Sequence, residues 1–345
     1  MKYDIITIGT ATRDVFLTSP LFKVLTDVAH LKKIGFPTGE AQCFALGGKV
    51  EIDAPVLTTG GGATNAAVTF GRQGFKAACL AKIGDDAIAG DVEAELVKEG
   101  VKTILKRSAA KSTAFSTILL APSGERTILV YRGASEDLQK SDCAALQKIK
   151  SRWAYFVPGG IKFEVIAGLA AKLRRAGVLL AINPSKPYIQ MGVKKLKPLL
   201  EKMSVVILNR EEAAYLAGCD YRAEEKIFKA MDALVDGIAV VTDGPRGVKV
   251  SDGRAIYQAG IYKEKILADR TGAGDAFGSG FVAGLMRARD CRRPTASEIK
   301  YAIRLASANA TAVVENIGAK KGILTRGAFE KSPHWRDLKI TERPL

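Results

Sequence analysis

The chain has 345 residues, of which 47% are hydrophobic, and a formal net charge of +16. This length and apolar content predict a globular protein, built as one large domain or as a domain with a small appendage. No apolar run reaches the roughly 18 residues that a membrane-spanning helix needs, and the N-terminus has no signal-peptide pattern. We therefore expect a soluble, cytoplasmic protein with no membrane partner.

Cysteine and histidine usage excludes several kinds of site. The five cysteines are far apart, odd in number and without C-x-x-C spacing, which argues against a disulfide framework or a zinc site. Only two histidines are present, His30 and His334. The basic residues are dispersed and accompany no nucleic-acid-binding motif, so we expect no nucleic-acid partner. A basic surface that attracts anionic substrates such as ATP explains the charge.

Short apolar runs alternate with amphipathic segments along most of the chain. The strands are expected at 5–9, 77–84, 154–157, 178–183, 205–209 and 238–242, with a hairpin over 248–257. The helices are expected at 65–74, 87–100, 164–177, 193–202, 210–217, 223–235, 274–289 and 296–316. This order predicts an α/β fold with a mostly parallel central sheet covered by helices on both faces.

Two early segments interrupt this alternation. One carries a hairpin pattern, with strands at 115–120 and 127–131 around a turn at Pro122-Ser123-Gly124-Glu125. We assign segments 14–58 and 107–132 to a small β-sheet lid, although edge hairpins on the main sheet are an alternative. The main domain then comprises residues 1–13, 59–106 and 133–330. Residues 331–345 form a charged C-terminal tail that we expect to be loosely held.

The segment 269–277, Asp-Arg-Thr-Gly-Ala-Gly-Asp-Ala-Phe, carries the clearest chemical signal. Small residues run directly into a helical pattern, and the start of a helix offers free N–H groups and a positive dipole end to an anion. Asp275 at that point can take a proton from a hydroxyl group. An anion cradle and a base so close together predict phosphoryl transfer to an alcohol.

A second glycine cluster, Gly60-Gly61-Gly62, also precedes a helix, with Asn65 in its first turn. An amide there can donate to and accept from sugar hydroxyls, but such a turn can also be an ordinary capped loop. Asp14 follows the first strand and lies where open α/β sheets bind ligands. Taken alone, Asp14 is better explained as a surface acid.

Two further motifs follow later strands. Asn209 and Glu212 share one face at a helix start, where an amide and an acid can hold hydrated Mg²⁺ or simply cap the helix. The glycines of Thr242-Asp243-Gly244-Pro245-Arg246-Gly247 leave room for a nucleotide, or form only a hairpin turn. The glycine-rich run 278–284 lies inside a helical pattern, and we interpret it as close helix packing and not as a dinucleotide site.

Together these residues resemble the PfkB, or ribokinase-like, family of sugar and nucleoside kinases. The resemblance extends from Ile5 to about Leu324, and the four motifs occur in the family's order. It implies a ribokinase-like three-layer α/β/α fold with a β-sheet lid that often contributes to a homodimer. It also implies ATP as co-substrate, Mg²⁺, and K⁺ in some members.

The resemblance also implies residue roles. The catalytic residues would be the base Asp275 and the anion hole of Gly272, Ala273 and Gly274. The acceptor would be held by Asp14, Gly61, Gly62 and Asn65, and the nucleotide and its Mg²⁺ by Asn209, Glu212, Thr242, Gly244, Gly247 and Asn309. Asp269 and Thr271 lie where some members bind a monovalent cation. Mg²⁺ would contact Glu212 through water.

Two positions depart from the family pattern. Many ribokinases and phosphosugar kinases carry lysine where Gly62 stands, and Arg270 replaces a residue that is commonly small. We expect an ATP-dependent kinase that acts on a small sugar such as ribose, fructose or a keto-deoxy sugar acid. A nucleoside kinase of the adenosine type is the alternative. A non-catalytic ligand-binding protein on the same fold is the alternative from another class.

Overall fold

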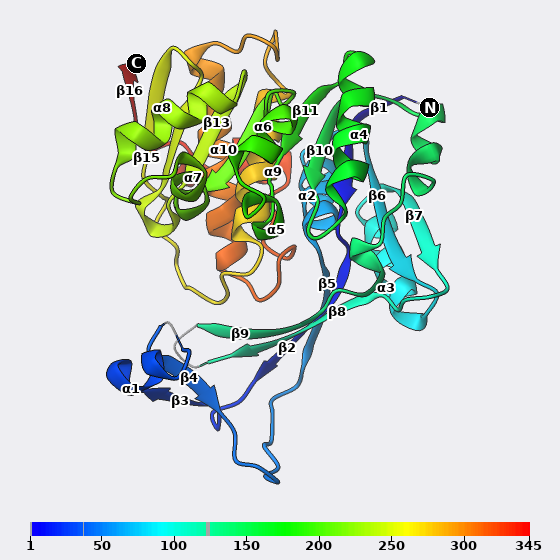
Figure 1. The fold of residues 1–345 in the computed structure, drawn as a ribbon, viewed down its shortest axis with the longest axis vertical. Helices are drawn as coiled ribbons and strands as arrows, with labels where there is room; N and C mark the ends of the chain where they lie inside the picture. The colour runs from blue at the N-terminus through cyan, green and yellow to red at the C-terminus, as the bar shows by residue number, and fades with distance from the viewer. Residues whose placement is uncertain (1, 37, 122–124) are drawn as a thin grey trace.

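The computed structural model describes residues 2–36, 38–121 and 125–345. Its largest element is a ten-stranded sheet in the order β16-β15-β14-β13-β12-β11-β10-β1-β6-β7 (Figure 1). From β13 to β7 all neighbouring strands are parallel, whereas β14, β15 and β16 are antiparallel. The strands are β1 (Lys2–Gly9), β6 (Ala77–Gly84), β7 (Lys102–Ser108), β10 (Lys150–Val157), β11 (Leu179–Ile182), β12 (Val205–Asn209), β13 (Ile238–Thr242), β14 (Val248–Ser251), β15 (Ala255–Ala259) and β16 (Ile340–Pro344).

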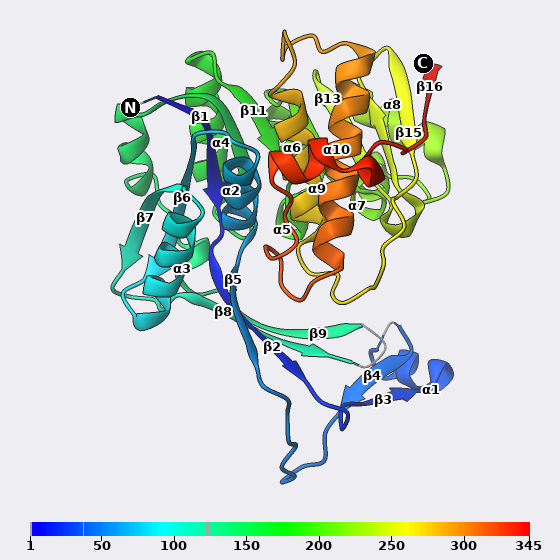
Figure 2. The same cartoon turned by 180° about the vertical axis from the view of Figure 1, so that it is seen from behind.

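Helices cover both faces of this sheet, as the alternating pattern predicts. Figure 2 shows the face with α2 (Gly62–Arg72), α3 (Ala87–Lys98), α9 (Ala273–Leu285), α10 (Ala296–Val314) and α11 (Arg326–Lys331). The face in Figure 1 carries α4 (Phe163–Arg175), α5 (Lys186–Ile189), α6 (Val193–Leu200), α7 (Arg210–Ala217) and α8 (Glu224–Leu234). The expected three-layer α/β/α architecture is confirmed.

Small residues allow α9 and α10 to pack closely. A Cβ atom on Gly284 would lie 2.5 Å from the Cα of Ala302, and one on Gly280 would lie 3.1 Å from the Cα of Ala306. Side chains at these positions would push the two helices apart. The glycine-rich run inside α9 therefore serves helix packing, as expected, and this packing fixes the N-terminus of α9 against the sheet.

A separate four-stranded sheet extends from the main domain, in the order β5-β2-β8-β9. Its strands are β2 (Thr12–Thr18), β5 (Val56–Gly60), β8 (Ala114–Leu120) and β9 (Arg126–Tyr131). We call these four strands the lid sheet. The hairpin of β8 and β9 matches the sequence pattern, although Pro122, Ser123 and Gly124 of its expected turn lie outside the described residues.

The segment between β2 and β5 has structure that the sequence did not predict. It contains the two-stranded sheet of β3 (Lys23–Thr26) and β4 (Glu40–Cys43), with the short helix α1 (Val28–Lys33) between them. Asp27 caps α1 by accepting a hydrogen bond from the His30 N–H. A helix of 6 residues is too short for a periodic pattern to stand out.

The expectation of a loosely held C-terminal tail was wrong. β16 pairs antiparallel with β15 along five residues, and Trp335 and Leu338 are buried in the hydrophobic core. The backbone ladder and these two apolar side chains hold the segment, although its charged composition suggested otherwise. No helix within the described residues is long and apolar enough to cross a membrane.

Phe281 tests the packing that positions α9. Its side chain is fully buried in the core that α9 shares with α10 and the sheet. We expect Phe281→Ala to lower the free energy of unfolding by about 3–5 kcal/mol, because it leaves a large cavity. Urea denaturation measures this loss, and Val97→Ala, at an exposed position of α3, is the control. A loss no larger than that of the control would contradict the packing described here.

Candidate functional site

Asp275 lies in the first turn of α9, at the carboxyl edge of the parallel strands. Gly272 is the N-cap of this helix, with φ of +81°, and no side chain caps the helix. A Cβ atom on Gly272 would also collide with Ala319, so only glycine fits there. The first amide groups of α9 are therefore not used by a capping side chain, and they form an anion-binding helix start next to a carboxylate.

Asn65 holds the Asp275 carboxylate from the neighbouring helix α2. Its Nδ2 donates to Asp275 Oδ2 at 2.9 Å. The Asn65 side chain is buried, yet its Oδ1 has no hydrogen-bond partner within the described part of the chain. A buried amide oxygen without a donor is costly, and a hydroxyl group of a bound ligand would satisfy it.

Glycines bring α2 and α9 together at this point. Gly61 is the N-cap of α2 with φ of +95°, and a Cβ atom there would lie 2.6 Å from the Cα of Ala11. A Cβ atom on Gly62 would collide with Val157 and lie 3.1 Å from Asp275 Oδ1. A side chain as long as lysine thus has no space at this position without a shift of Val157 and of the site.

Asp14 reaches the same region from β2 of the lid sheet. It is buried, accepts a hydrogen bond from Thr12 Oγ1 at 2.9 Å, and occupies the space that a side chain at Gly60 would need. Burial raises the pKa of Asp14. Burial also raises the pKa of Asp275, with the Asn65 hydrogen bond lowering it and the Asp14 charge raising it. The two carboxylates therefore share one poorly solvated site.

A cavity of about 270 Å³ adjoins the N-terminus of α9. On one side it is lined by Thr242, Gly244 and Gly247, and on another by Ala273 and Gly274, all of which the sequence predicted for the nucleotide and phosphate. The third wall comes from α10 and was not predicted; it consists of Ser307, Ala310, Thr311 and Val314. Their spacing marks one face of a helix.

Asn309 is not among the residues that line this cavity, and the expectation that it approaches the adenine stays a prediction. It is fully buried; its Nδ2 donates to the Ala276 carbonyl at 2.8 Å and its Oδ1 accepts from the Leu324 N–H at 2.9 Å. Two positions along a helix correspond to a rotation of about 200°. Ser307 therefore faces the cavity, and its buried Oγ has no hydrogen-bond partner within the described residues.

Asn209 and Glu212 form a capping box at the start of α7. The Glu212 N–H donates to Asn209 Oδ1 at 2.8 Å, and Glu212 Oε2 accepts from the Asn209 N–H at 2.9 Å. Burial raises the pKa of Glu212, and the hydrogen bond from Asn209 lowers it. The described residues contain no cluster of three or more metal-ligating side chains. A Mg²⁺ that keeps most of its water molecules fits this pair, because such an ion needs few protein ligands.

Asp269 and Thr271 are brought together, but their polar groups serve each other. Asp269 is fully buried, and its Oδ1 accepts from the N–H and the hydroxyl of Thr271 at 2.9 and 2.7 Å. Its Oδ2 accepts from the Gly318 N–H at 3.2 Å. Three donors satisfy this carboxylate within the chain. The polar side chains of Asp269 and Thr271 are thus engaged within the chain, and a monovalent-cation site at these residues stays a prediction.

Lys320 is a charged residue near the site that the motifs did not reveal. Its ammonium group is buried, donates to Thr59 Oγ1, and lies 3.2 Å from Glu95 Oε2. Burial lowers the pKa of Lys320 and Glu95 raises it. The preceding residue, Ala319, lies against Gly272. Lys320 thus ties the loop that supports the helix start of α9 to β5 and α3.

The pH dependence of catalysis tests the contact between Asn65 and Asp275. A base acts only when deprotonated, and the pKa of Asp275 is raised above its ordinary value of 3.8. We expect kcat/KM to fall as the pH decreases through this raised value. Asn65→Leu removes the hydrogen bond that lowers the pKa, so the acidic limb should move to higher pH. The measurement is the pH profile of kcat/KM.

Asn316→Leu is the matched control for that profile. Asn316 Nδ2 donates to the Ala312 carbonyl at the end of α10, and this contact does not involve Asp275. Its acidic limb should coincide with that of the unmodified protein. An acidic limb that stays in place in Asn65→Leu, or moves to lower pH, would contradict the assignment of Asp275 as the titrating base.

Comparison with known proteins places this geometry in a family. The profile of the "pfkB family carbohydrate kinase" matches residues 37–326. The ribokinase of Haemophilus influenzae is 29% identical over 78% of this chain and 85% of its own length. Fructokinase-1 of Oryza sativa subsp. japonica is 28% identical over 69% of this chain and 75% of its own length.

Solved structures show the same fold. A probable sugar kinase from Rhizobium etli has a TM-score of 0.76 at 22% identity and covers 96% of this chain and 99% of its own. The adenosine kinase from Sinorhizobium meliloti has a TM-score of 0.76 at 21% identity, again with 96% and 99% coverage. The ribokinase of Arabidopsis thaliana, solved with ribose and ATP, has a TM-score of 0.73 at 18% identity, with 97% and 99% coverage. The chain belongs to the pfkB family of carbohydrate kinases and is a phosphotransferase.

Proposed function

We propose that this protein transfers the γ-phosphoryl group of ATP to a hydroxyl group of a small sugar, such as ribose, fructose or a keto-deoxy sugar acid. The observation that carries the proposal is the Asp275 carboxylate, held by Asn65 at the uncapped start of α9. The adjoining cavity of about 270 Å³ is suited to the nucleotide. Asp14, Gly61, Gly62 and Asn65 then surround the acceptor.

Each residue has a defined task in the transfer. Asp275 accepts the proton of the acceptor hydroxyl, whose oxygen forms a bond to the γ-phosphorus. The bond from that phosphorus to the oxygen of ADP breaks, and ADP leaves with the electron pair. The amide groups of Gly272, Ala273 and Gly274 stabilise the negative charge of the phosphoryl group in transit. No covalent enzyme intermediate is needed.

The nucleotide side of the site uses backbone and small side chains. Thr242, Gly244 and Gly247 border the cavity for ATP, and Ser307 supplies a hydroxyl without a partner in its wall. Glu212, through water, and Asn209 would hold Mg²⁺. This ion, when bound, neutralises charge on the phosphates. Burial and, to a smaller extent, the like charge of Glu211 raise the pKa of Glu212, and a nearby cation would favour its charged form.

The aromatic residues of the lid region favour a sugar over a nucleoside as acceptor. A nucleoside base needs an apolar wall, and the candidates in the sequence were Phe16, Phe22, Phe44 and Phe115. Phe16 is buried in a small core with Ile118 and Leu120. Phe22 packs edge-to-face against Phe44, with 5.6 Å between the ring centroids. Of the four candidates, Phe115, which is half-buried, and the outer part of Phe44, which is 45% exposed, are left to contact a base.

The central test is Asp275→Asn in a phosphoryl-transfer assay. We expect kcat to fall by about 10²–10⁴, the usual contribution of a general base, while a non-hydrolysable ATP analogue still binds. Release of ADP is measured with ribose, fructose, 5-dehydro-2-deoxygluconate and adenosine as acceptors. Asp290→Asn, beyond the other end of α9, is the control and should retain activity.

The outcomes of this assay separate the alternatives. Unchanged turnover in Asp275→Asn would remove Asp275 from its role. Transfer to adenosine, with none to the sugars, would establish the nucleoside kinase. An unmodified protein that binds the ATP analogue and a sugar but transfers to no acceptor would be the non-catalytic binding protein.

We also propose that two copies of the chain associate through the lid sheet. β9 is an edge strand on which Ile128, Leu129, Val130 and Tyr131 are all exposed. At the opposite edge, Val56 and Leu57 of β5 are exposed as well. Exposed apolar edge strands favour pairing with another chain. A second copy presents the same strands and can cover them symmetrically.

Sedimentation velocity tests this association. We expect a dimer for the unmodified protein and a monomer for Leu129→Glu, because a buried carboxylate in the interface lacks a partner. Leu129 is 58% exposed, and Tyr215→Glu, at an equally exposed position (58%) on α7, is the matched control. A monomeric unmodified protein, or a Leu129→Glu variant that remains dimeric, would contradict this arrangement.

A further inference from the structure

The loop between β13 and β14 separates two cavities. Thr242, Gly244, Pro245 and Gly247 line the cavity that we assign to the nucleotide. Asp243 and Arg246, from the same loop, line a second cavity of about 150 Å³ on its other side. Residues of one short loop thus face opposite cavities. Contacts that fix Asp243 and Arg246 therefore also fix the loop residues that line the cavity assigned to the nucleotide.

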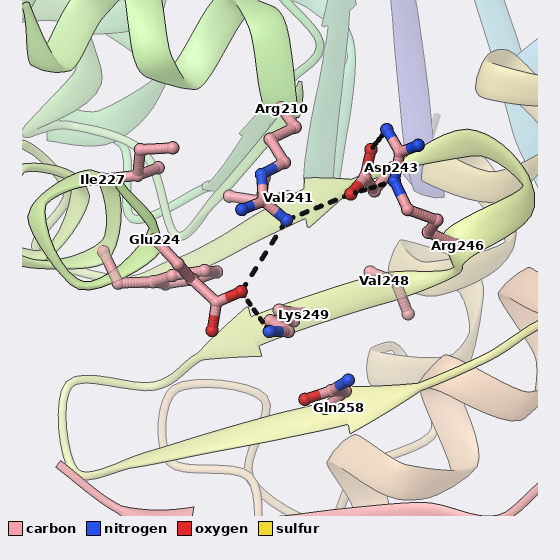
Figure 3. Close-up of a pocket in the computed structure, with 10 residues that line it drawn as sticks. Arg210, Glu224, Ile227, Val241, Asp243, Arg246, Val248, Lys249 and Gln258 are labelled. Carbon is pink, nitrogen blue, oxygen red and sulfur yellow. Dashed lines mark hydrogen bonds and ion pairs between the residues drawn. The ribbon is translucent and has the colours of Figure 1, made fainter. Parts of the chain in front are cut away.

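Four side chains anchor the loop: Asp243 and Arg246 of the loop itself, and Arg210 and Tyr221 from neighbouring elements. We call them the arginine–aspartate cluster. Asp243 Oδ2 accepts from Arg246 Nε at 2.9 Å and from Arg210 Nη1 at 3.1 Å (Figure 3). The Tyr221 hydroxyl donates to Asp243 Oδ1. The guanidinium groups of Arg210 and Arg246 lie 4.9 and 5.5 Å from the centroid of the Tyr221 ring.

The cluster is electrostatically strong and continues into neighbouring elements. The hydrogen bond from Arg246 and those from Tyr221 and Arg210 lower the pKa of Asp243 to about 2, so it is charged at any physiological pH. Arg210 Nη1 also lies 3.7 Å from Glu224 at the start of α8, and Glu224 pairs with Lys249 on β14 (Figure 3).

Because the charges of this second cavity pair with one another, the cavity is not an open anion site. Arg210, Arg246 and Lys249 face Asp243 and Glu224, and each cation has a carboxylate within reach. Such a network gives little attraction to a ligand but restrains the elements that carry it. Such side-chain contacts matter most where glycines leave the backbone free to adopt several conformations. The loop contains Gly244 and Gly247, with φ of +52° and +91°.

The cluster joins the two nucleotide-side motifs to each other. Asn209 and Thr242 are register partners at the ends of the adjacent strands β12 and β13. Arg210 directly follows Asn209 and starts α7, and Asp243 directly follows Thr242. The ion pair between Arg210 and Asp243 therefore links the capping box of Asn209 and Glu212 to the loop 242–247.

We propose that the arginine–aspartate cluster is a positioning device for the nucleotide, which sets the affinity for ATP by fixing the loop 242–247 relative to Asn209 and Glu212. The inference rests on the proposed function, since it takes the adjoining cavity as the ATP site. None of the four side chains needs to touch ATP. Asp275 and the acceptor residues lie on other elements and should be unaffected.

Asp243→Asn is the decisive variant, because it keeps the size of the side chain and removes its charge. Arg210 retains Glu224, so the substitution leaves no buried cation unpaired. We expect the Kd for a non-hydrolysable ATP analogue, measured by calorimetry without acceptor, to rise roughly 10-fold through the loss of charge-assisted hydrogen bonds. The KM for ATP should rise equally, while kcat stays within about 3-fold and the KM for the sugar is unchanged.

Asp142→Asn is the matched control. Asp142 is a carboxylate of similar exposure, 17% against 12% for Asp243, and it pairs with Lys82 at 3.0 Å. This variant should lose comparable stability but keep the affinity for the ATP analogue. Arg246→Gln is the second loop variant; its side chain is 66% exposed, so the protein should fold even if Asp243→Asn does not. It should weaken binding of the analogue in the same direction.

Three outcomes decide the inference. Normal affinity for the ATP analogue in Asp243→Asn and Arg246→Gln would overturn it. So would an equal loss in Asp142→Asn, which would mean a general effect of stability. If the unmodified protein itself fails to bind the analogue, the proposed ATP site falls, and this is a separate result from a failure of the positioning role.

Discussion

The hydrogen bond between Asn65 and Asp275 is the contact on which the site depends. It joins residues 210 positions apart and fixes the starts of α2 and α9 against each other. One turn further along, Ser279 Oγ donates to Thr69 Oγ1 at 2.9 Å, which ties the same two helices again. The glycines at the helix starts and along α9 remove the side chains that would keep these elements apart. These contacts hold the Asp275 carboxylate in a poorly solvated position at the start of α9.

Much of the fold could be predicted because local signals and tertiary packing agree. Val205–Asn209, Arg210–Ala217 and Ile238–Thr242 have the expected bounds. These strands are buried and almost wholly apolar, and Asn209 provides an unambiguous helix start. In β16, by contrast, the residues are mostly exposed and polar. Backbone pairing with β15 makes this segment a strand, and the amino-acid sequence carries no local sign of that pairing.

The part of the site that holds the proposed base was more predictable than its surroundings. Asp275, Asn65 and the glycines stand in short motifs whose spacing itself implies a helix start. Ser307 and Lys320 have no such motif; they matter only because α10 and the loop after it lie against α9. The sequence also did not show that the Asn309 amide bonds to the Ala276 carbonyl inside the core, or that Ser307, two residues earlier, lines the cavity. The arginine–aspartate cluster requires α7, α8 and two strands to be placed together first.

The placement of Asp14 has a consequence for the proposed closure of the lid sheet over the acceptor. Asp14 belongs to the lid sheet, whereas Asn65 and Asp275 belong to helices of the main domain. Only Thr10 and Ala11 separate β1 from β2, and only Gly61 separates β5 from α2. Under the proposed function, an acceptor that contacts both Asp14 and Asn65 would link the lid sheet to the main domain across these short connections. Substrate capture and exclusion of water are then one event, so a molecule too short to bridge both halves would leave the phosphoryl group exposed to hydrolysis.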